Sequence, residues 1–219
     1  MAKDYPKVAV DLIIFSIVDS QLSVALIQMK KKPFENKWAF PGGLVNIKES
    51  LDDAAKRELK EKTSISKVYL EQLYTSGEVN RDPLNRVVSV VYFALLDNKN
   101  LHLKTSVKYK AIRWFPIKKL PSLAYDHNKI AIIACERLKG KLKYTNIVYN
   151  LLPRYFTLSQ LQHVYETILD QSLDKRNFRK KIQTLQILKS TKKYKTDGTH
   201  RPALLYSFKE HALKIIDIL

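Results

Sequence analysis

The sequence has a single cysteine, Cys135, and no hydrophobic run that approaches the ~20 residues needed to span a membrane. One cysteine cannot form an internal disulfide, which argues against a disulfide-stapled secreted domain and favours a reducing compartment. The first residues, MAKDYPKVAVDL, carry two acidic side chains around a short apolar run and make a poor signal peptide. We therefore expect a cytoplasmic protein with no membrane partner.

Acidic residues are scarce relative to basic ones. The 219 residues include 39 lysines and arginines against 21 aspartates and glutamates, a formal net charge of +18. Residues 141–219 hold 15 basic and 6 acidic residues, so the last third is the more basic per residue. Such an excess predicts a polyanionic partner, although a general richness in surface lysine is an alternative. Hydrophobic residues make up 45% of the chain, enough for a buried core.

The first 140 residues mix strand and helix signals without a regular βαβ rhythm. Gly42 and Gly43 predict a turn. An S-x-x-D pattern at Ser50 and Asp53 predicts a helix start, and Asp126 is expected to cap a second helix. The expected strands cover 7–18, 22–30, 66–75, 86–96 and 108–117, the first two as a hairpin, and the expected helices cover 50–63 and 127–139. We therefore expect an α+β domain over residues 1–140.

Residues 141–219 have a different, mainly helical pattern. A T-x-x-Q capping box at Thr157 and an N-cap at Asp174 each predict a helix start, and Gly198 predicts the tip of a hairpin. Helices are expected at 147–153, 157–169, 175–188 and 209–219, with the hairpin at 189–208. This order is typical of a winged helix-turn-helix domain. We expect it over residues 153–219, after a connecting segment at 141–152.

Carboxylates gather in the stretch PGGLVNIKESLDDAAKRELKEKTSI, residues 41–65. Glu58 and Glu61 share a helix face and could ligate Mg²⁺, which prefers several oxygen ligands and often bridges carboxylates to phosphates. Lys62 lies on the same face and cannot bind a metal as an ammonium. Lys62 also follows Glu58 by four residues, the favourable order for a helix ion pair, which is worth ~0.3–0.5 kcal/mol when exposed and competes with metal binding. The stretch therefore predicts a weak Mg²⁺ site at most, and no required cofactor.

The same stretch resembles the signature of the Nudix hydrolases. The matching residues are Gly43, Glu49, Arg57, Glu58, Leu59 and Glu61. Two positions depart from the signature, because Lys62 stands where the family carries a metal ligand and Ser64 where it carries glycine. The flanking sequences PFENKWAFPGG and GEVNRDPLNRVVSVVYFAL are similar to the subfamily that acts on ADP-ribose-like compounds. The resemblance covers residues 7–140 and implies a Nudix α/β/α sandwich, whose hydrolase activity is impaired and whose Glu58 is vestigial.

Aromatic and arginine side chains of this domain are candidate ligand contacts. Aromatic rings can stack on a base, and arginines can clamp a pyrophosphate. Burial in the core is the alternative for the aromatic residues, and a solvated loop is the alternative for Arg81 and Arg86. For His127, at an expected helix start, a structural role is favoured over a catalytic one. The predicted ligand contacts are Phe34, Trp38, Phe40, Arg57, Arg81 and Arg86.

The helix expected from residue 175 onward separates apolar from hydrogen-bonding side chains. Phe178, Ile182 and Leu185 share one face, and long polar side chains share the other. Arginine reads guanine and asparagine or glutamine reads adenine in the major groove, while hairpin lysines can grip phosphates. A solvated amphipathic helix is the alternative. The predicted DNA contacts are Lys175, Arg176, Asn177, Arg179, Lys180, Gln183, Lys193 and Arg201.

A second resemblance covers the C-terminal part. FTLSQLQHVYETILDQSLDKRNFRKKI and THRPALLYSF are similar to the Nudix-related transcriptional regulators of NAD metabolism. In that family a degenerate Nudix domain binds ADP-ribose, and a winged helix binds operator DNA near NAD-biosynthesis genes. The resemblance implies a repressor that binds a palindromic operator as a homodimer. An active ADP-ribose pyrophosphatase, or a related regulator that senses a sugar or sugar phosphate, stays open as an alternative.

Overall fold

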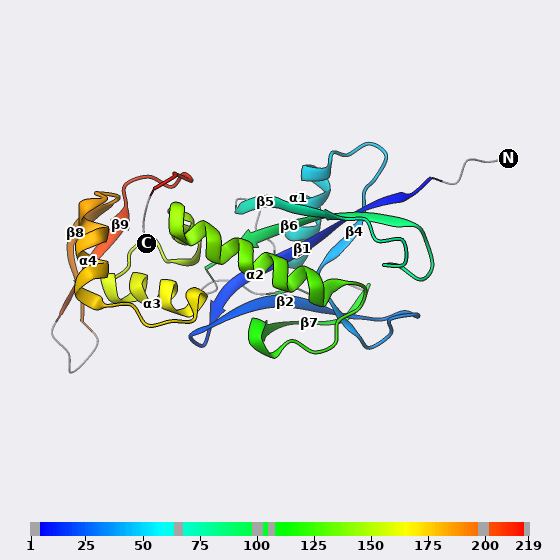
Figure 1. Ribbon diagram of the computed structural model, residues 1–219, viewed down its shortest axis with the longest axis horizontal. Coiled ribbons are helices and arrows are strands. Elements are labelled where there is room, and N and C mark those ends of the chain that lie inside the picture. The colour runs from blue at the N-terminus through cyan, green and yellow to red at the C-terminus, as the bar shows by residue number, and fades with distance from the viewer. Residues whose placement is uncertain (1–4, 64–67, 98–102, 105–107, 197–201, 217–219) are drawn as a thin grey trace. The chain divides into compact units, whose positions relative to one another are not determined.

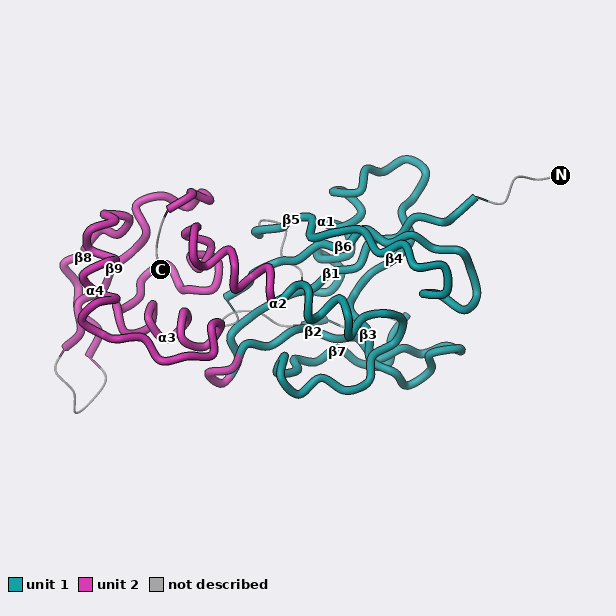
Figure 2. Tube along the Cα trace, viewed as in Figure 1, with its two compact units in different colours: residues 1–18, 22–135 teal, residues 19–21, 136–219 magenta. Residues whose placement is uncertain are grey.

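The computed structural model describes residues 5–63, 68–97, 103–104, 108–196 and 202–216 of the chain. The chain forms two compact units, coloured separately in Figure 2. The first unit comprises Met1–Val18 and Leu22–Cys135, and the second comprises Asp19–Gln21 and Glu136–Leu219. The division falls within one helix, α2 (His127–Tyr144).

The first unit is built on a mixed sheet of seven strands within the described residues (Figure 1). The strands are β1 (Lys7–Val18), β2 (Gln21–Met29), β3 (Trp38–Ala39), β4 (Gly42–Leu44), β5 (Tyr69–Ser76), β6 (Val87–Leu95) and β7 (Tyr109–Pro116). β1 is central, parallel to β6 and antiparallel to β4, while β7 and β3 pair with β2. β1 and β2 are neighbours joined by Asp19 and Ser20, both with positive φ, as in two-residue hairpin turns.

Both faces of β1 are buried, as expected for a strand between two layers. Val10, Leu12 and Ile14 pack in one cluster with residues of α1 (Leu51–Thr63). Because side chains alternate along a strand, Asp11 faces the opposite side, where His127 of α2 lies 3.6 Å away. A mixed α+β fold for this unit is thereby confirmed.

The two glycines before α1 belong to strand β4, so the prediction of a turn there was wrong. Gly43 pairs with Val10 and Gly42 with Asp11 across the sheet. A Cβ atom at Gly42 would lie 2.4 Å from the carbonyl oxygen of Val10, so close backbone approach requires glycine here. The end expected for α2 was also wrong, since the helix continues past Gly140 to Tyr144.

The second unit contains the predicted winged helix. Its elements are η3 (Ile147–Leu151), α3 (Leu158–Leu169), α4 (Lys175–Thr184), β8 (Leu188–Lys195) and β9 (Ala203–Phe208) (Figure 1). The Thr157 capping box and the Asp174 N-cap are both present. The rings of Tyr165 on α3 and Phe178 on α4 pack 5.3 Å apart. Phe156 and Tyr206 exchange two backbone hydrogen bonds, which ties the start of α3 to the β8–β9 hairpin.

Three predicted helices in the second unit differ from the structure. The segment at 147–153 is the 3₁₀ helix η3, and α4 ends at Thr184 because Gln186 adopts a positive φ of 48°. The helix expected at 209–219 is absent from residues 209–216, and residues 217–219 lie outside the described part. There the backbone pairs with residues 144–146 instead, with Ile215 opposite Thr145.

Candidate functional site

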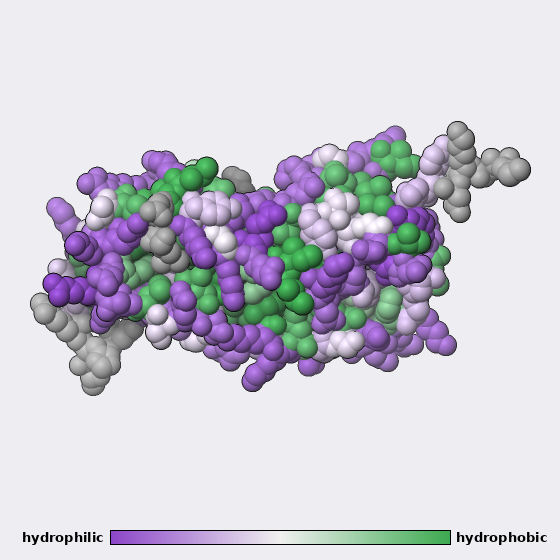
Figure 3. All heavy atoms as spheres, viewed as in Figure 1, coloured by the Kyte–Doolittle hydropathy of each residue, from purple (hydrophilic) through white to green (hydrophobic). Residues whose placement is uncertain are grey.

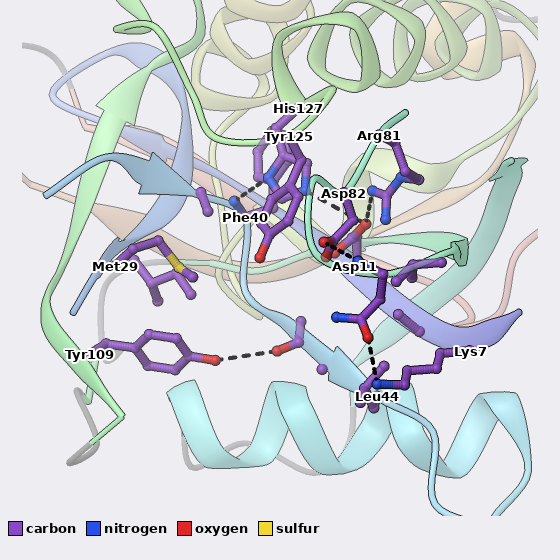
Figure 4. A pocket seen from close by; sticks show the side chains of 17 residues that line it. Lys7, Asp11, Met29, Phe40, Leu44, Arg81, Asp82, Tyr109, Tyr125 and His127 are labelled. Carbon is purple, nitrogen blue, oxygen red and sulfur yellow. Dashed lines mark hydrogen bonds and ion pairs between the residues drawn. The ribbon is translucent and has the colours of Figure 1, made fainter. Parts of the chain in front are cut away.

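A cavity of about 190 Å³ opens in the first unit where β1 meets β4 (Figure 4). Its wall combines aromatic rings with side chains of both charge signs. The aromatic and charged lining residues are Lys7, Phe40, Arg81, Asp82, Tyr109, Tyr125, Asp11 and His127. Such a mixture suits a small ligand that has both a flat ring and charged groups.

One wall of the cavity is a buried charge network around Asp11. Arg81 Nη2 donates to Asp11 Oδ2 and to Asp126 Oδ1, each at 2.8 Å, and Ser89 donates to Asp11 at 2.7 Å. Burial raises the pKa of Asp11, but His127, Arg81 and the Ser89 hydrogen bond together lower it to about 2. Burial likewise opposes ionisation of Asp126, yet the hydrogen bond from Arg81 lowers its pKa overall. The Arg81 guanidinium is therefore matched by two carboxylates of the protein itself.

His127 joins this network to the segment between β3 and β4. The backbone N–H of Phe40 donates to His127 Nδ1 at 2.9 Å, and the two rings lie 5.2 Å apart. Because Nδ1 accepts this hydrogen bond, the ring N–H is on Nε2, which lies 3.6 Å from Asp11 Oδ2. The contact with Phe40 is structural, and the same ring also lines the cavity. Asp126 directly precedes α2, at the expected cap position, and its carbonyl accepts from the Ile130 N–H, while its side chain accepts hydrogen bonds from Arg81 and Ser76.

Behind the cavity, α1 carries a partly buried cluster of acidic and basic side chains, in which Glu58 and Lys62 are the buried members. Arg57 Nη1 lies 2.5 Å from Glu58 Oε1, and Lys62 Nζ lies 3.6 Å from Glu58 Oε2 and 3.3 Å from Glu61 Oε2. The Lys62 side chain is 0% exposed and that of Glu58 is 3% exposed. The pair expected between these two residues is therefore present, and it is buried.

This cluster does not fit a divalent metal ion. Mg²⁺ requires several oxygen ligands in near-octahedral geometry, and each Glu58 oxygen already faces a cationic side chain. Within the described ranges, no group of three or more His, Cys, Asp or Glu side chains is placed to hold a metal. Gly43 packs closely against the same carboxylate, because a Cβ atom there would lie 2.4 Å from Glu58 Oε1.

Two of the six predicted ligand contacts, Phe40 and Arg81, line the cavity. The other two aromatic residues pack on neighbouring rings, Phe34 on Tyr125 and Trp38 on Phe115. Both remaining arginines are held by other groups of the protein. Arg57 donates to the Glu49 carboxylate, and Arg86 donates to backbone carbonyls at residues 77, 78 and 87.

Sequence reasoning missed Asp11, Tyr109 and Tyr125 as lining residues. Asp11 carried a usable signal, because a charged residue inside a buried β-strand is rarely accidental and is usually paired. Nothing in the sequence marked the two tyrosines as lining residues, because Tyr109 begins β7 and Tyr125 precedes α2, and no spacing rule relates the two positions. The hydroxyl of Tyr109 donates to the carbonyl of Gly42 across the cavity (Figure 4).

In the second unit, α4 presents a basic face. The exposed residues on it are Lys175, Arg176, Asn177, Lys180 and Gln183, and all but Asn177 line one shallow groove. Hydrophilic side chains cover much of the surface that Figure 3 shows around α4. Phe178 and Ile182 are buried on the opposite face, as predicted. A face of this composition is suited to the major groove of DNA.

The remaining predicted DNA contacts are Arg179, Lys193 and Arg201. Arg179 also lines this groove, but it is half-buried and donates to Ser159 of α3 at 3.2 Å, so it links the two helices. Lys193 is exposed on β8 beside a register shift between Ser190 and Tyr194. Arg201 lies outside the described residues.

No helix in the described part of the chain has the length and apolar character needed to cross a membrane. Comparisons with known proteins assign both units. Residues 6–134 match the NUDIX domain, and residues 148–208 match the NrtR DNA-binding winged helix domain. The first unit is also 35% identical over 126 residues to the ADP-ribose pyrophosphatase of Methanocaldococcus jannaschii, covering 58% of this chain and 71% of that protein.

Two further relatives resemble the chain over both units. The ADPR responsive transcriptional repressor NtrR of Acinetobacter baylyi is 37% identical over 211 residues, covering 94% of this chain and 84% of that protein. Shewanella oneidensis NrtR, in complex with a 27mer DNA, has a TM-score of 0.81 and 33% identity, covering 92% of this chain and 93% of that one. Its NUDIX domain in complex with ADP ribose has a TM-score of 0.56 and 34% identity, covering 63% of this chain and 91% of that one. The chain therefore belongs to the NrtR family of Nudix-related transcriptional regulators.

Proposed function

We propose that this protein is an ADP-ribose-responsive transcriptional repressor of genes of NAD metabolism. The observation that carries the proposal is the similarity to an ADPR responsive repressor over 94% of the chain, across both units and in the same order. The geometry agrees with it. A cavity with aromatic and charged walls lies in the Nudix unit, and an exposed basic helix lies in the winged helix unit.

The cavity supplies the groups that a nucleotide diphosphate needs. Phe40, Tyr109 and Tyr125 offer aromatic surface for a base, and Lys7 and Arg81 offer positive charge for phosphate oxygens. Lys7 is bonded to the neutral Asn85 side chain at 2.7 Å, whereas Arg81 is matched by Asp11 and Asp126. No metal ion is required in this proposal, and any Mg²⁺ binding through Glu58 and Glu61 is weak.

DNA binding is assigned to α4 together with the hairpin lysines. The protein binds as a homodimer in the cytoplasm, and its operator is palindromic because a two-fold dimer presents two equivalent helices. Such helices reach successive major grooves when they lie about 34 Å apart. ADP-ribose changes the affinity for operator because it binds the DNA-competent and DNA-incompetent states unequally.

One measurement tests the proposal directly. Operator binding is followed by fluorescence anisotropy with and without ADP-ribose, and with ribose 5-phosphate in a parallel titration. We expect ADP-ribose to change the operator affinity and the sugar phosphate to leave it unchanged. An unchanged affinity with ADP-ribose, or a response to ribose 5-phosphate alone, would contradict the assignment of the effector.

A matched pair of variants tests the docking of α4. Arg176→Ala should weaken operator binding by about 1–3 kcal/mol and relax the preference for one base pair. Arg113→Ala removes the same charge from an exposed site on β7 of the Nudix unit and should leave binding unchanged. Equal effects of the two substitutions would indicate that only net charge matters.

A working ADP-ribose pyrophosphatase is the second candidate, favoured by the 35% identity of the first unit to such an enzyme. The burial of Lys62 between Glu58 and Glu61 disfavours it. Chromatography of the nucleotide after incubation with Mg²⁺ separates the two candidates. Recovery of intact ADP-ribose supports the repressor, whereas release of AMP that Glu58→Gln abolishes supports the enzyme.

A further inference from the structure

We infer that the Lys62 ammonium replaces a divalent cation beside Glu58 and Glu61, so that the protein does not bind Mg²⁺ there and binds its effector without metal. The part of this inference that concerns the effector rests on the function proposed above. The part that concerns metal rests on α1 and its surroundings alone.

The position of Lys62 is that of a buried counter-ion. Its Nζ lies between two carboxylates, 3.6 Å from Glu58 and 3.3 Å from Glu61, and 4.8 Å from the centroid of the Tyr109 ring. Tyr109 and Gly43 line the cavity, so they separate this ammonium from a bound ligand. Because the ammonium belongs to a side chain of the protein, this positive charge is always present directly behind the cavity wall.

Three cationic side chains face the three carboxylates of the cluster. Arg57 pairs with Glu49 and one oxygen of Glu58, Lys62 lies near the other oxygen of Glu58 and near Glu61, and Lys108 lies 3.8 Å from Glu61. A buried carboxylate without a cationic partner is strongly unfavourable, so some cation has to be present beside Glu58. Lys62 meets this need permanently, and its aromatic contact with Tyr109 adds a cation–π interaction.

A divalent ion could not share the site. Mg²⁺ binds carboxylate oxygens at about 2.0–2.1 Å, which would place it next to the ammonium that lies between the same two side chains. The two cations would repel each other at that separation, and a protonated lysine offers no lone pair as a ligand. Lys62 therefore opposes metal binding between Glu58 and Glu61, while Arg57 occupies the other oxygen of Glu58.

Replacing Lys62 by an acidic side chain should allow a divalent ion to bind beside Glu58 and Glu61. Lys62→Glu places three carboxylates at i, i+3 and i+4 of one helix, a set of hard oxygen ligands without a counter-ion. We expect this variant to have a lower Tm in EDTA, and a Tm that rises with Mn²⁺ or Mg²⁺ concentration, because the ion binds the folded chain. Mn²⁺ binding followed by electron paramagnetic resonance should be roughly tenfold or more tighter than in the unchanged protein.

Lys60→Glu is the matched control. Lys60 is exposed on the same helix, and the substitution changes the net charge by the same amount. We expect no metal-dependent Tm in this variant. Lys62→Gln, which keeps a neutral oxygen ligand and avoids a third carboxylate, provides a milder substitution should Lys62→Glu fail to fold. It too should bind Mn²⁺ more tightly than the unchanged protein.

The unchanged protein supplies the deciding comparison. Its Tm should be the same in EDTA and in Mg²⁺, and it should bind ADP-ribose equally well in both. Tight Mn²⁺ binding by the unchanged protein, or folded Lys62 variants that bind no more Mn²⁺ than it does, would overturn the inference. If ADP-ribose binds only with Mg²⁺, the inference about metal is overturned and the proposed function stands. If the protein binds no metal and no ADP-ribose, the proposed function is overturned and the inference about metal stands.

Discussion

Substitution of Asp11 by asparagine tests the charge network beside the cavity. The pKa of Asp11 falls from its ordinary value of 3.8 to about 2, and the carboxylate is buried. One pKa unit corresponds to about 1.4 kcal/mol, so ionised Asp11 contributes about 2 kcal/mol to the free energy of unfolding at neutral pH. Because the folded-state pKa is the lower one, this contribution is complete above pH 3.8 and is lost as the pH falls to about 2.

The assay is urea denaturation followed by tryptophan fluorescence. Both tryptophans of the sequence, Trp38 and Trp114, belong to the first unit, so their signal reports on the unit that contains Asp11. We expect Asp11→Asn to lower the free energy of unfolding by about 2 kcal/mol at pH 7 and by much less near pH 2. Asp19→Asn serves as the control, since Asp19 is exposed with a φ of 47° that asparagine also tolerates.

Two results would refute this reasoning. If Asp11→Asn is as stable as the unchanged protein at pH 7, the carboxylate contributes nothing through its partners. If it is equally destabilised at pH 7 and at pH 2, the loss comes from packing and not from charge.

Two further predictions concern single backbone positions. Gly43→Ala should lower the free energy of unfolding by ~1–3 kcal/mol, because the added Cβ would meet Glu58 Oε1 at 2.4 Å. Gly140→Ala should raise the free energy of unfolding by ~0.5–1 kcal/mol, because Gly140 lies within helix α2 and its added Cβ would meet nothing within 4 Å. Urea denaturation followed by circular dichroism measures both, and an equal effect of the two substitutions would contradict the steric reasoning. Thr157→Ala should destabilise α3 by about 1 kcal/mol and speed exchange of its first amides, while Thr157→Ser should not. Unchanged exchange in Thr157→Ala would mean that the cap is dispensable.

Local signals in the sequence were sufficient for most of the fold. Apolar alternation located the long strands, and caps at Ser50, Thr157 and Asp174 located helix starts, because each cap is a hydrogen bond within three residues. The errors arose where distant segments compete with local preference. Gly42 and Gly43 are typical of a turn, but pairing with β1 makes them a strand. Residues 209–216 have helical spacing, but their backbone bonds go to residues 144–146.

The candidate site was less predictable for the same reason. Glu58, Glu61 and Lys62 could be grouped from their spacing on one helix, but the packing of Tyr109 over Lys62, and of Gly43 against Glu58, comes from distant strands. The cavity wall draws on β1, β4, β7 and the residues before α2, which no spacing rule relates. Arg81 was predicted as a ligand contact, yet its two carboxylate partners lie 70 and 45 residues away in sequence.

The placement of charges explains why the same fold can serve as a receptor. Lys62 and Arg57 are fully engaged by carboxylates of α1 and Glu49, so they stabilise the unit whether or not a ligand is present. Arg81 differs because it lines the cavity and holds Asp126, the residue directly before α2. Asp11 and Asp126 both bond Nη2 of Arg81, so an anionic ligand at the remaining N–H groups would add a third negative charge to the guanidinium that holds Asp126. Ligand binding and the position of Asp126 would then be coupled through one side chain.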